Sequence, residues 1–371
     1  MSQILVTGGA GFIGAHLVDA LLEAGEEVRV LDNLDPLAHA DGVPAHLSPE
    51  AELVVGDLRD RDAVERALDG VDRVFHLGGA VGNGESMINV RRAVDVNSGG
   101  TATLLEATLE RRDRIRRVVA ASSMVVYGEG SYRCAEHGVA SPPPRPPEQL
   151  ARRDWEPRCG TCGAELEPVA THESAPLRPA SVYGITKRDQ EELVLVLGRA
   201  YGLETVALRY LNVYGPRQAL SNPYTGVAAI FAARLLNGRP PLVFEDGRQI
   251  RDLVHVSDIV RATRLAMDAQ NAPGNAINVA TGRRVRVAEL AGGLAEALGA
   301  ELDPQITGEA RAGDIRHCFA DVGRARDLLE FEARRSLADG LPELAEWVAA
   351  QHVEERGDKA VSQLRARGLV G

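Results

Sequence analysis

The chain lacks the features typical of nucleic-acid-binding, membrane and secreted proteins. Its 42 Lys and Arg residues are outnumbered by 53 Asp and Glu, and no basic tail or stripe occurs, which argues against nonspecific binding to nucleic acid or to anionic membranes. Its apolar runs are the size of strands or helices and are interrupted by charge, so none would span a bilayer. The first residues enter a strand pattern at once, which leaves no room for a signal peptide. We therefore expect a soluble, cytoplasmic protein with no nucleic-acid or membrane partner.

The chain also lacks an internal repeat, but strand and helix patterns alternate along it. Its 371 residues exceed the roughly 250–300 that a single core usually reaches, which indicates two lobes. Strands separated by helices are typical of an α/β protein with a doubly wound parallel sheet, whose ligands bind at the carboxyl ends of the strands. The expected strands cover residues 4–6, 28–31, 53–57, 73–77, 117–123 and 206–212.

A glycine-rich turn follows the first expected strand. Gly8, Gly11 and Gly14 lead into a helical pattern, and such a turn lets the pyrophosphate of a dinucleotide sit at the start of a helix. The second strand is followed by Asp32, at the distance of about 20 residues where a carboxylate accepts hydrogen bonds from both ribose hydroxyls. This pattern favours NAD over NADP. The alternative is a structural turn beside a solvated Asp32.

Two later strands end in residues suited to a cofactor and a reaction. Gly78 and Gly79 follow the fourth strand, where small side chains leave room for a cofactor backbone. The fifth strand ends at Ser123, and Tyr183 and Lys187 are four residues apart, so on a helix they share one face. The alternative for the Tyr183–Lys187 pair alone is an ordinary amphipathic surface helix.

Ser123, Tyr183 and Lys187 together indicate hydride chemistry on an alcohol. The Lys187 cation, together with a nicotinamide charge, would lower the pKa of Tyr183 toward neutrality. Tyr183 would then take the proton of a sugar hydroxyl while the adjacent carbon gives hydride to NAD. Ser123 would hydrogen-bond the same oxygen. We therefore predict these three residues to be catalytic.

These motifs resemble the extended short-chain dehydrogenase/reductase family, specifically its NAD-dependent nucleotide-sugar epimerases and dehydratases. The resemblance implies a tightly held NAD(H), a C-terminal lobe that binds a nucleotide diphosphate sugar, and a homodimer built through a four-helix contact. It is carried by residues 7–14, 57–58, 76–80, 122–128, 183–187, 209–217, 251–256 and 311–317. The expected cofactor-binding residues are Gly8, Gly11, Phe12, Ile13, Gly14, Asp32, Asn33, Asp57, Leu58, Leu77, Gly78, Gly79, Asn97, Tyr183 and Lys187.

Two residues after Ser123 bear on the reaction. The sugar 4,6-dehydratases of the family carry Asp-Glu where this chain has Met124 and Val125, and the UDP-glucuronate decarboxylases carry Glu in place of Val125. Without those acids, Ser123, Tyr183 and Lys187 still suffice for oxidation at C4, rotation of the 4-keto sugar and reduction from its other face. The resemblance therefore implies a nucleotide-sugar 4-epimerase.

The sugar is suggested by a second, narrower resemblance. Residues 80–87 and the segment between Ser123 and Tyr183 resemble a subgroup of bacterial epimerases associated with dTDP-6-deoxysugars such as dTDP-L-rhamnose. A UDP-glucose or UDP-glucuronate 4-epimerase is an alternative, as is a 4-ketoreductase, which would consume reduced cofactor. A binding module that only senses NAD is a fourth possibility, against which the intact Ser123, Tyr183 and Lys187 argue.

Four residues are candidates for holding the diphosphate or the sugar, in addition to Ser123. Asn212 ends the sixth expected strand, where a side-chain amide can hydrogen-bond a ligand oxygen. Arg217, Arg251 and Arg311 are expected to converge on the diphosphate, since a guanidinium binds phosphate with two parallel hydrogen bonds. The alternative for any one arginine is a solvated surface position.

Three of the four cysteines lie between Ser123 and Tyr183. The spacing of Cys134 and His137, followed by Cys159 and Cys162, is that of two zinc knuckles that complete one tetrahedral site. A short segment with few apolar residues cannot fold on its own core, so a structural Zn²⁺ would order it. A disulfide, a redox Cys-x-x-Cys and unused cysteines are alternatives. Cys318 is expected to be a buried small hydrophobe.

These patterns give a domain prediction. The zinc-ribbon-like insertion is expected either to form a rim or lid over the sugar pocket or to make a dimer contact. The expected parts are residues 1–133 and 164–212, with about 250–272, for the NAD-binding Rossmann domain; 134–163 for the insertion; 213–249 and 273–350 for the smaller mixed α/β nucleotide-sugar-binding lobe; and 351–371 for a C-terminal helical tail.

Overall fold

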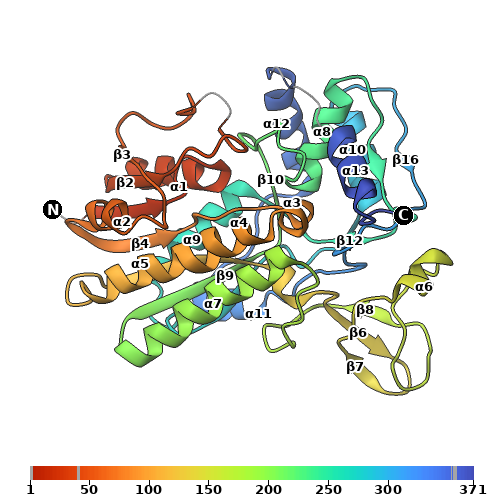
Figure 1. Ribbon diagram of the computed structural model, residues 1–371, viewed down its shortest axis with the longest axis horizontal. Coiled ribbons are helices and arrows are strands. Elements are labelled where there is room, and N and C mark those ends of the chain that lie inside the picture. The colour runs from red at the N-terminus through yellow and green to blue at the C-terminus, as the bar shows by residue number, and fades with distance from the viewer. Residues whose placement is uncertain (1–2, 40–41, 352, 354–356) are drawn as a thin grey trace.

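The computed structural model describes residues 3–39, 42–351, 353 and 357–371, and a parallel β-sheet forms its centre (Figure 1). Its seven strands lie in the order β14–β9–β5–β4–β1–β2–β3, and every neighbouring pair is parallel. The predicted doubly wound fold is thereby confirmed. The strands are β1 (Gln3–Thr7), β2 (Glu27–Asp32), β3 (Glu52–Val55), β4 (Val71–His76), β5 (Arg117–Ser123), β9 (Glu204–Tyr210) and β14 (Ala276–Val279).

Two hydrophobic cores cover the two faces of the sheet. Successive side chains of a strand point to opposite faces, so Ile4 and Val6 of β1 belong to one core and Leu5 to the other. Burial on both faces explains why β1 is continuously apolar from Ile4 to Val6. The first core includes helices α1 (Phe12–Glu23), α9 (Val256–Asp268) and α11 (Gly323–Leu329), and the opposite face is covered by α2 (Arg61–Leu68), α5 (Gly100–Leu109) and α7 (Val182–Tyr201).

Two strand predictions run two residues too far. The strand expected over 53–57 is β3, which ends at Val55. The expected strand over 206–212 is β9, which ends at Tyr210, and Asn212 instead begins the short strand β10 (Asn212–Tyr214). The chain leaves the main sheet there, because β10 pairs with β13 (Leu253–His255). Strand β14 at the edge of the sheet was not predicted. Asn212 therefore lies where the chain passes from one lobe to the other.

The second lobe has its own core, built mainly from three helices. These are α8 (Val227–Leu236), α10 (Val287–Ala297) and α12 (Leu337–Ala349). Two short strand pairs are separate from the main sheet: β11 (Leu242–Val243) with β16 (Gln305–Ile306), and β12 (Ile250–Arg251) with β15 (Val285–Arg286). The C-terminal helix α13 (Gly357–Ala366) contacts α8, because Asp358 accepts a hydrogen bond from Arg234 (2.5 Å).

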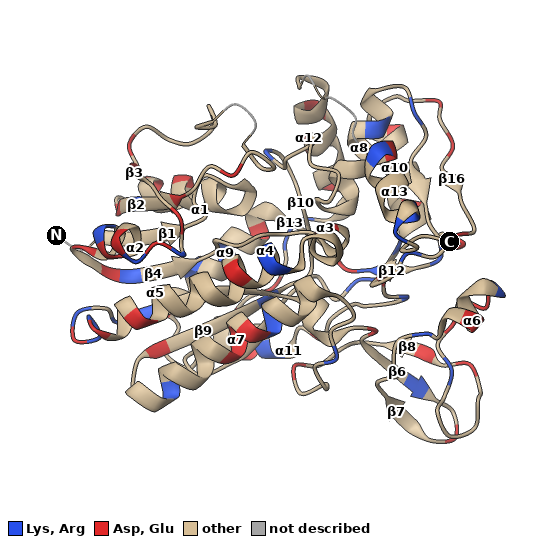
Figure 2. Ribbon diagram, viewed as in Figure 1, with Lys and Arg blue, Asp and Glu red and all other residues tan. Residues whose placement is uncertain are grey.

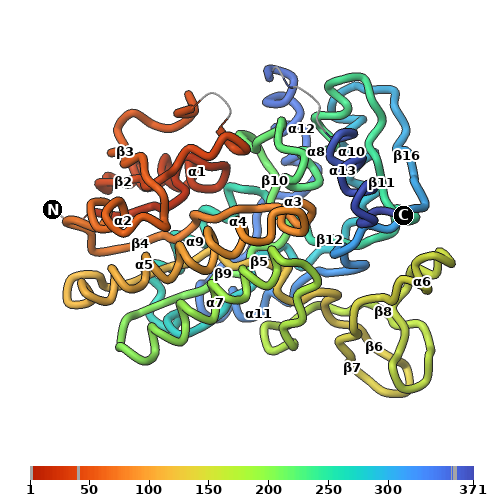
Figure 3. The backbone as a smooth tube through the Cα atoms, viewed as in Figure 1, coloured from red at the N-terminus to blue at the C-terminus, as the bar shows by residue number. Residues whose placement is uncertain are grey.

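The insertion between β5 and α7 forms a small separate sheet. Strand β6 (Ser131–Cys134) pairs antiparallel with both β7 (Gly138–Ala140) and β8 (Glu167–Val169), and α6 (Pro147–Ala151) lies between β7 and β8 in the chain. The tube in Figure 3 shows this segment projecting beyond the main sheet and returning to it before α7. The domain boundaries themselves stay a prediction.

The distribution of charged residues over the helices and the hydropathy of the helices agree with the expectations drawn from the composition. Lys and Arg residues alternate with Asp and Glu along the outer helices (Figure 2). Among the described residues, no helix combines the length and the apolar character needed to cross a membrane.

Candidate functional site

A cavity of about 540 Å³ lies where the carboxyl ends of the sheet strands meet the second lobe. Residues of both lobes line this cavity. Its position at the carboxyl ends of the strands is the one expected for the ligand site of a doubly wound sheet. Eighteen of the twenty residues predicted from sequence for the cofactor, the substrate or catalysis line it; Asn97 and Arg217 do not. The eighteen are Gly8, Gly11, Phe12, Ile13, Gly14, Asp32, Asn33, Asp57, Leu58, Leu77, Gly78, Gly79, Ser123, Tyr183, Lys187, Asn212, Arg251 and Arg311.

The glycine turn brings the start of α1 to the cavity. Gly8 has a left-handed φ of 69°, and a Cβ there would lie 2.8 Å from the Cα of Gly78. A Cβ on Gly14 would lie only 2.1 Å from the carbonyl oxygen of Gly8. Only glycine at these two positions therefore allows the glycine turn to pack so closely against the loop after β4 and against the start of α1. The free N–H groups at the helix start can receive a phosphate.

Asp32 is positioned by the backbone at the end of β2. It is 8% exposed, and its two carboxylate oxygens accept hydrogen bonds from the backbone N–H groups of Ala10 (3.1 Å) and Leu34 (3.0 Å). These bonds fix the carboxylate beside the glycine turn. Asn33 donates to Asp57 (3.1 Å), and hydrogen bonds from Arg59 hold the pKa of Asp57 well below its usual range. The carboxylate of Asp57 is therefore ionised at neutral pH, on the side of the cavity nearest to β3.

Asn97 acts behind the cavity wall. It is fully buried, accepts a hydrogen bond from the backbone N–H of Ala80 (2.7 Å), and donates to the carbonyl oxygen of Ala80 and to Thr186. It therefore holds the loop after β4 against α7. Sequence reasoning missed His76, which hydrogen-bonds Thr7 (2.8 Å) from the last residue of β4. Burial lowers the pKa of His76 to about 3, so its ring is neutral there.

The predicted catalytic residues come together at the ends of β5 and α7. Ser123 is the last residue of β5, and its hydroxyl hydrogen-bonds that of Tyr183. Lys187 is buried one turn further along α7 and donates to the carbonyl oxygen of Ala121 (2.9 Å). The helix begins after Ser181, whose side chain caps the backbone N–H of Gly184. The cap and the hydrogen bond to β5 fix the first turn of α7 over the strand end.

The expected lowering of the Tyr183 pKa is not produced by the protein's own groups. Burial raises the pKa of Tyr183 above its ordinary value, and the hydrogen bond from Ser123 offsets this only in part. Burial also lowers the pKa of Lys187 to about 8. The cation of Lys187 is therefore present at neutral pH and is lost as the pH rises through about 8. Tyr183 therefore stays protonated at neutral pH in the protein alone.

The three predicted arginines have different surroundings. Arg311 lies over the ring of Phe244 at 5.2 Å and donates to Asp314 (2.9 Å). Within the part of the chain that the structure describes, Arg251 donates only to backbone carbonyl oxygens, so no carboxylate there compensates its charge. Arg217 instead donates to Asp19 of α1 (2.6 Å) and is not part of the cavity wall. The geometry does not support a diphosphate contact for Arg217, because Asp19 already holds its guanidinium.

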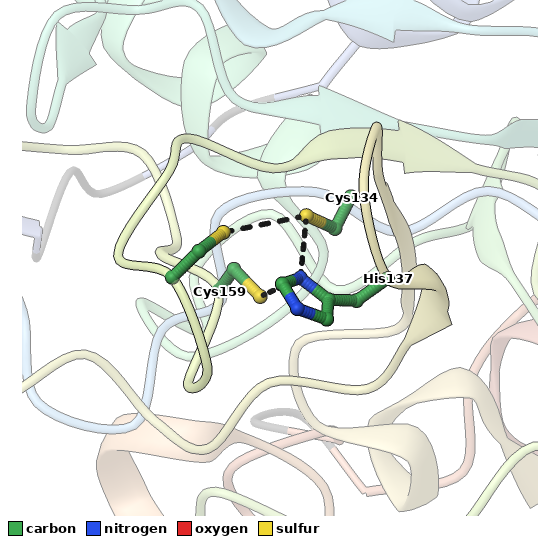
Figure 4. Close-up of side chains that lie close together, drawn as sticks. Cys134, His137 and Cys159 are labelled. Carbon is green, nitrogen blue, oxygen red and sulfur yellow. Dashed lines mark hydrogen bonds between the residues drawn. The ribbon is translucent and has the colours of Figure 1, made fainter.

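The predicted metal ligands lie together at the open side of the insertion sheet. The ligand atoms of Cys134, His137, Cys159 and Cys162 all lie within 4.8 Å of one another. Figure 4 shows Cys134, His137 and Cys159 pointing to a common centre. The sulfur of Cys134 is 3.5 Å from Nδ1 of His137 and 3.6 Å from the sulfur of Cys162, and the sulfur of Cys159 is 3.7 Å from Nδ1 of His137.

These separations fit a tetrahedral zinc site. Zinc–ligand bonds of 2.3 Å to sulfur and about 2.0–2.1 Å to nitrogen at tetrahedral angles place two sulfurs about 3.8 Å apart, and a sulfur and a nitrogen about 3.5 Å apart. Backbone N–H groups of Glu136 and His137 lower the pKa of Cys134, and those of Cys162 and Thr161 lower the pKa of Cys159. Both effects favour the thiolates that bind metal. Cys318 is buried in the main core, as predicted.

Comparison with known proteins identifies the family. Residues 4–149 and 159–280 match the NAD dependent epimerase/dehydratase family, so the chain belongs to it. The gap between the two matched ranges, residues 150–158, lies within the insertion. A dTDP-L-rhamnose 4-epimerase of Burkholderia thailandensis is 33% identical over 352 residues, which cover 94% of this chain and 95% of that one. The predicted family resemblance is confirmed.

Solved structures show the same similarity. The UDP-glucose 4-epimerase of Thermotoga maritima, solved with UDP-glucose, superposes with a TM-score of 0.76 at 32% identity, covering 93% of this chain and 98% of that one. The UDP-glucuronic acid 4-epimerase of Bacillus cereus, solved with UDP-glucuronic acid and NAD, also has a TM-score of 0.76, at 25% identity and with the same coverage.

Proposed function

We propose that this protein is an NAD-dependent nucleotide-sugar 4-epimerase. The observation that carries the proposal is that Ser123, Tyr183 and the buried Lys187 line one cavity together with the glycine turn and Asp32. NAD, when bound, accepts hydride from C4 of the sugar and returns it. Tyr183 exchanges the proton of the C4 hydroxyl, Ser123 hydrogen-bonds the same oxygen, and the buried cation of Lys187 stabilises negative charge on Tyr183.

The carboxylates of the cavity favour epimerisation over dehydration. Met124 and Val125 line the cavity beside Ser123 and supply no acid or base. Among the described residues that line the cavity, the carboxylates are Asp32, Asp35, Asp57 and Asp314. The first three follow β2 or β3, at the proposed adenosine end, and Asp314 accepts a hydrogen bond from Arg311. A dehydratase needs a free acid and a base near C5 and C6, and none of these four is placed for that task.

The proposed substrate is a dTDP-6-deoxyhexose such as dTDP-L-rhamnose. The apolar side chains of Met124 and Val125 next to Ser123 suit a methyl group at C6, and the relative from Burkholderia thailandensis carries the name of that activity. UDP-glucose or UDP-glucuronate is the second candidate, because the structural relatives were solved with those nucleotide sugars.

A homodimer is also proposed. The helices α4 (Val90–Val94) and α7 expose the apolar side chains of Val90, Val94, Ile185 and Val196, and sedimentation analysis would test whether two chains associate. A cytoplasmic location fits the four free thiols.

Incubation with a panel of nucleotide sugars tests the reaction. We expect dTDP-L-rhamnose to be converted to its C4 epimer without added reductant and with no net change in NADH, followed by NMR. Conversion of UDP-glucose or UDP-glucuronate instead would assign the second candidate. A reaction that begins only when NADH or NADPH is supplied with a 4-keto sugar would show a reductase and would refute the epimerase.

We propose that Cys134, His137, Cys159 and Cys162 bind one structural Zn²⁺ per chain. Four protein ligands leave no open position for catalysis, so the metal orders the insertion. Cys159→Ser is expected to reduce the zinc content from one equivalent to near zero and to make residues 134–163 sensitive to limited proteolysis. Cys318→Ala, which removes a thiol outside the cluster, should keep the full zinc content. Wild-type protein that contains no metal by elemental analysis would refute the site.

A further inference from the structure

We propose that Glu156 is a positioning residue of the nucleotide-sugar site, through which the insertion sets the position of Arg251. The inference rests on the proposed function, since it assigns Arg251 to the diphosphate. Glu156 lies three residues before Cys159, in the insertion, whereas Arg251 lies on β12 at the cavity. A chain of hydrogen bonds connects the two.

Glu156 accepts hydrogen bonds from two consecutive residues of the second lobe. Arg316 donates to one carboxylate oxygen of Glu156 through Nε (3.0 Å) and Nη2 (2.5 Å), and Nε2 of His317 donates to the other (2.8 Å). The backbone N–H of Ile250 donates to Nδ1 of His317 (3.0 Å), so the ring carries its hydrogen on Nε2. His317 therefore links Glu156 directly to the residue that precedes Arg251.

Arg251 depends on the same segment for its orientation. Its guanidinium donates to the backbone carbonyl oxygens of Ile315 (2.8 Å), Arg316 (3.0 Å) and Ile250 (2.9 Å). Carbonyl oxygens fix the direction of the guanidinium without neutralising it, and a charged group held in advance binds phosphate at a lower entropic cost. A displacement of residues 315–317 would therefore turn Arg251 away from the diphosphate.

Two further contacts, from residues just before Cys134, hold the backbone of this segment. The backbone N–H of His317 donates to the hydroxyl of Tyr132 (3.2 Å), and that of Arg316 donates to Glu129 (2.6 Å). Tyr132 lies two residues before Cys134, as Glu156 lies three residues before Cys159. The cysteine cluster joins these two parts of the insertion. Its closure therefore fixes both contacts to the segment at once.

The fold is expected to survive the loss of the Glu156 charge. Burial would raise the pKa of Glu156, but hydrogen bonds from His317 and Arg316 outweigh it and lower the pKa to about 2, so the carboxylate is ionised. Arg316, although fully buried, also donates to Glu245 (2.8 Å) and Asp246 (2.6 Å). These two acids remain in Glu156→Gln, so the buried guanidinium stays paired. In Glu156→Gln the side-chain oxygen can accept from only one of the two partners. When it accepts from Arg316, the NH₂ group faces the Nε2–H of His317, and two donors cannot form a hydrogen bond. The variant therefore loses its hydrogen bond to His317.

Nucleotide binding measured by titration calorimetry tests the proposal. Wild type, Glu156→Gln and Asp154→Asn are titrated with UDP and with dTDP. Asp154 is a matched control, because its side chain forms only a solvent-exposed pair with Arg158 in the same loop. We expect Glu156→Gln to raise the Kd for the nucleoside diphosphate about tenfold, with unchanged NAD and zinc content per chain. The KM for the sugar nucleotide should rise in parallel while kcat changes less than about twofold. Asp154→Asn should match wild type.

The outcomes separate this inference from the proposed function. Equal Kd values for wild type and Glu156→Gln would overturn the positioning role and leave the proposed function intact. A wild type that binds neither nucleoside diphosphate would overturn both. If Glu156→Gln does not fold, Tyr132→Phe provides the test, because it removes the hydroxyl that accepts from the backbone N–H of His317 and donates to Glu129. An increase of about threefold in Kd for Tyr132→Phe is then expected, and an unchanged Kd would refute the proposal.

Discussion

Tyr183→Phe is expected to lower kcat by about a thousandfold or more and to leave NAD bound. The substitution removes the hydroxyl that hydrogen-bonds Ser123 and that would exchange the C4 proton, and positioned acid–base groups contribute about 10²–10⁴ in rate. The aromatic ring stays in the cavity wall, so cofactor affinity and thermal stability should change little. Turnover is followed by NMR on the preferred nucleotide sugar, and NAD content is measured after denaturation.

A tyrosine on the same helix supplies the control for this prediction. Tyr201 is the last residue of α7, with 54% of its surface exposed, and Tyr201→Phe should retain wild-type kcat and NAD content. Comparable losses in both variants would point to damage to α7 rather than to lost chemistry. A Tyr183→Phe enzyme that keeps a tenth or more of its activity would rule out Tyr183 as the group that exchanges the proton.

The cofactor side of the site could be predicted because its residues are local in sequence. The glycine turn, Asp32 and Ser123 each lie at or just after the carboxyl end of a strand. In a parallel doubly wound sheet those ends meet at one edge, so the strand patterns alone bring the residues together. Tyr183 and Lys187 needed only the spacing of one helical turn. The sequence therefore specified this half of the cavity through topology, without knowledge of any long-range contact.

Arg217 shows where this reasoning stops. Its sequence position near β10 suggested the cavity, but its guanidinium pairs with Asp19, 198 residues earlier in the chain. That pairing depends on how α1 packs against the loop after β10, which no periodicity or motif encodes. Asn97 differs for a related reason: its partners Ala80 and Thr186 turn it into a support for the cavity wall. In both cases the sequence indicated a residue type suited to the site, but it did not indicate where the side chain would point.

The contacts of the insertion could not be predicted for the same physical reason. Cysteine and histidine spacing is a local signal, and it located the cluster of Cys134, His137, Cys159 and Cys162. Glu156, in contrast, is an ordinary acidic residue in sequence, and its partner Arg316 is 160 positions away. Buried ion pairs form wherever packing excludes water, so their members carry no distinguishing pattern. The link between the insertion and Arg251 is therefore visible only in three dimensions.

Gly14→Ala is expected to weaken NAD binding at least about a hundredfold, or about 3 kcal/mol, and to lower the melting temperature. A Cβ at this position would lie 2.1 Å from the carbonyl oxygen of Gly8 and 2.7 Å from the Cα of Gly9. Both are backbone atoms, so no side-chain rotation relieves the clash, and α1 must move away from the glycine turn. The N–H groups that receive the pyrophosphate would move with the helix. NAD affinity of the apoprotein is measured by calorimetry.

Gly292→Ala provides a matched control, because it adds the same methyl group to a helix without a clash. Gly292 lies in α10, and its Cβ would meet no heavy atom within 4 Å. Alanine is the better helix former by about 0.8–1 kcal/mol, so this variant should be equally or more stable and should bind NAD like wild type. If Gly14→Ala also kept wild-type affinity, the pyrophosphate could not lie against the start of α1. If both variants lost NAD, the loss would reflect general destabilisation. We do not expect that result, because Gly292→Ala leaves the packing of the second lobe unchanged. The difference between the two alanines thus isolates the close approach of α1 to the glycine turn as the feature that binds the cofactor.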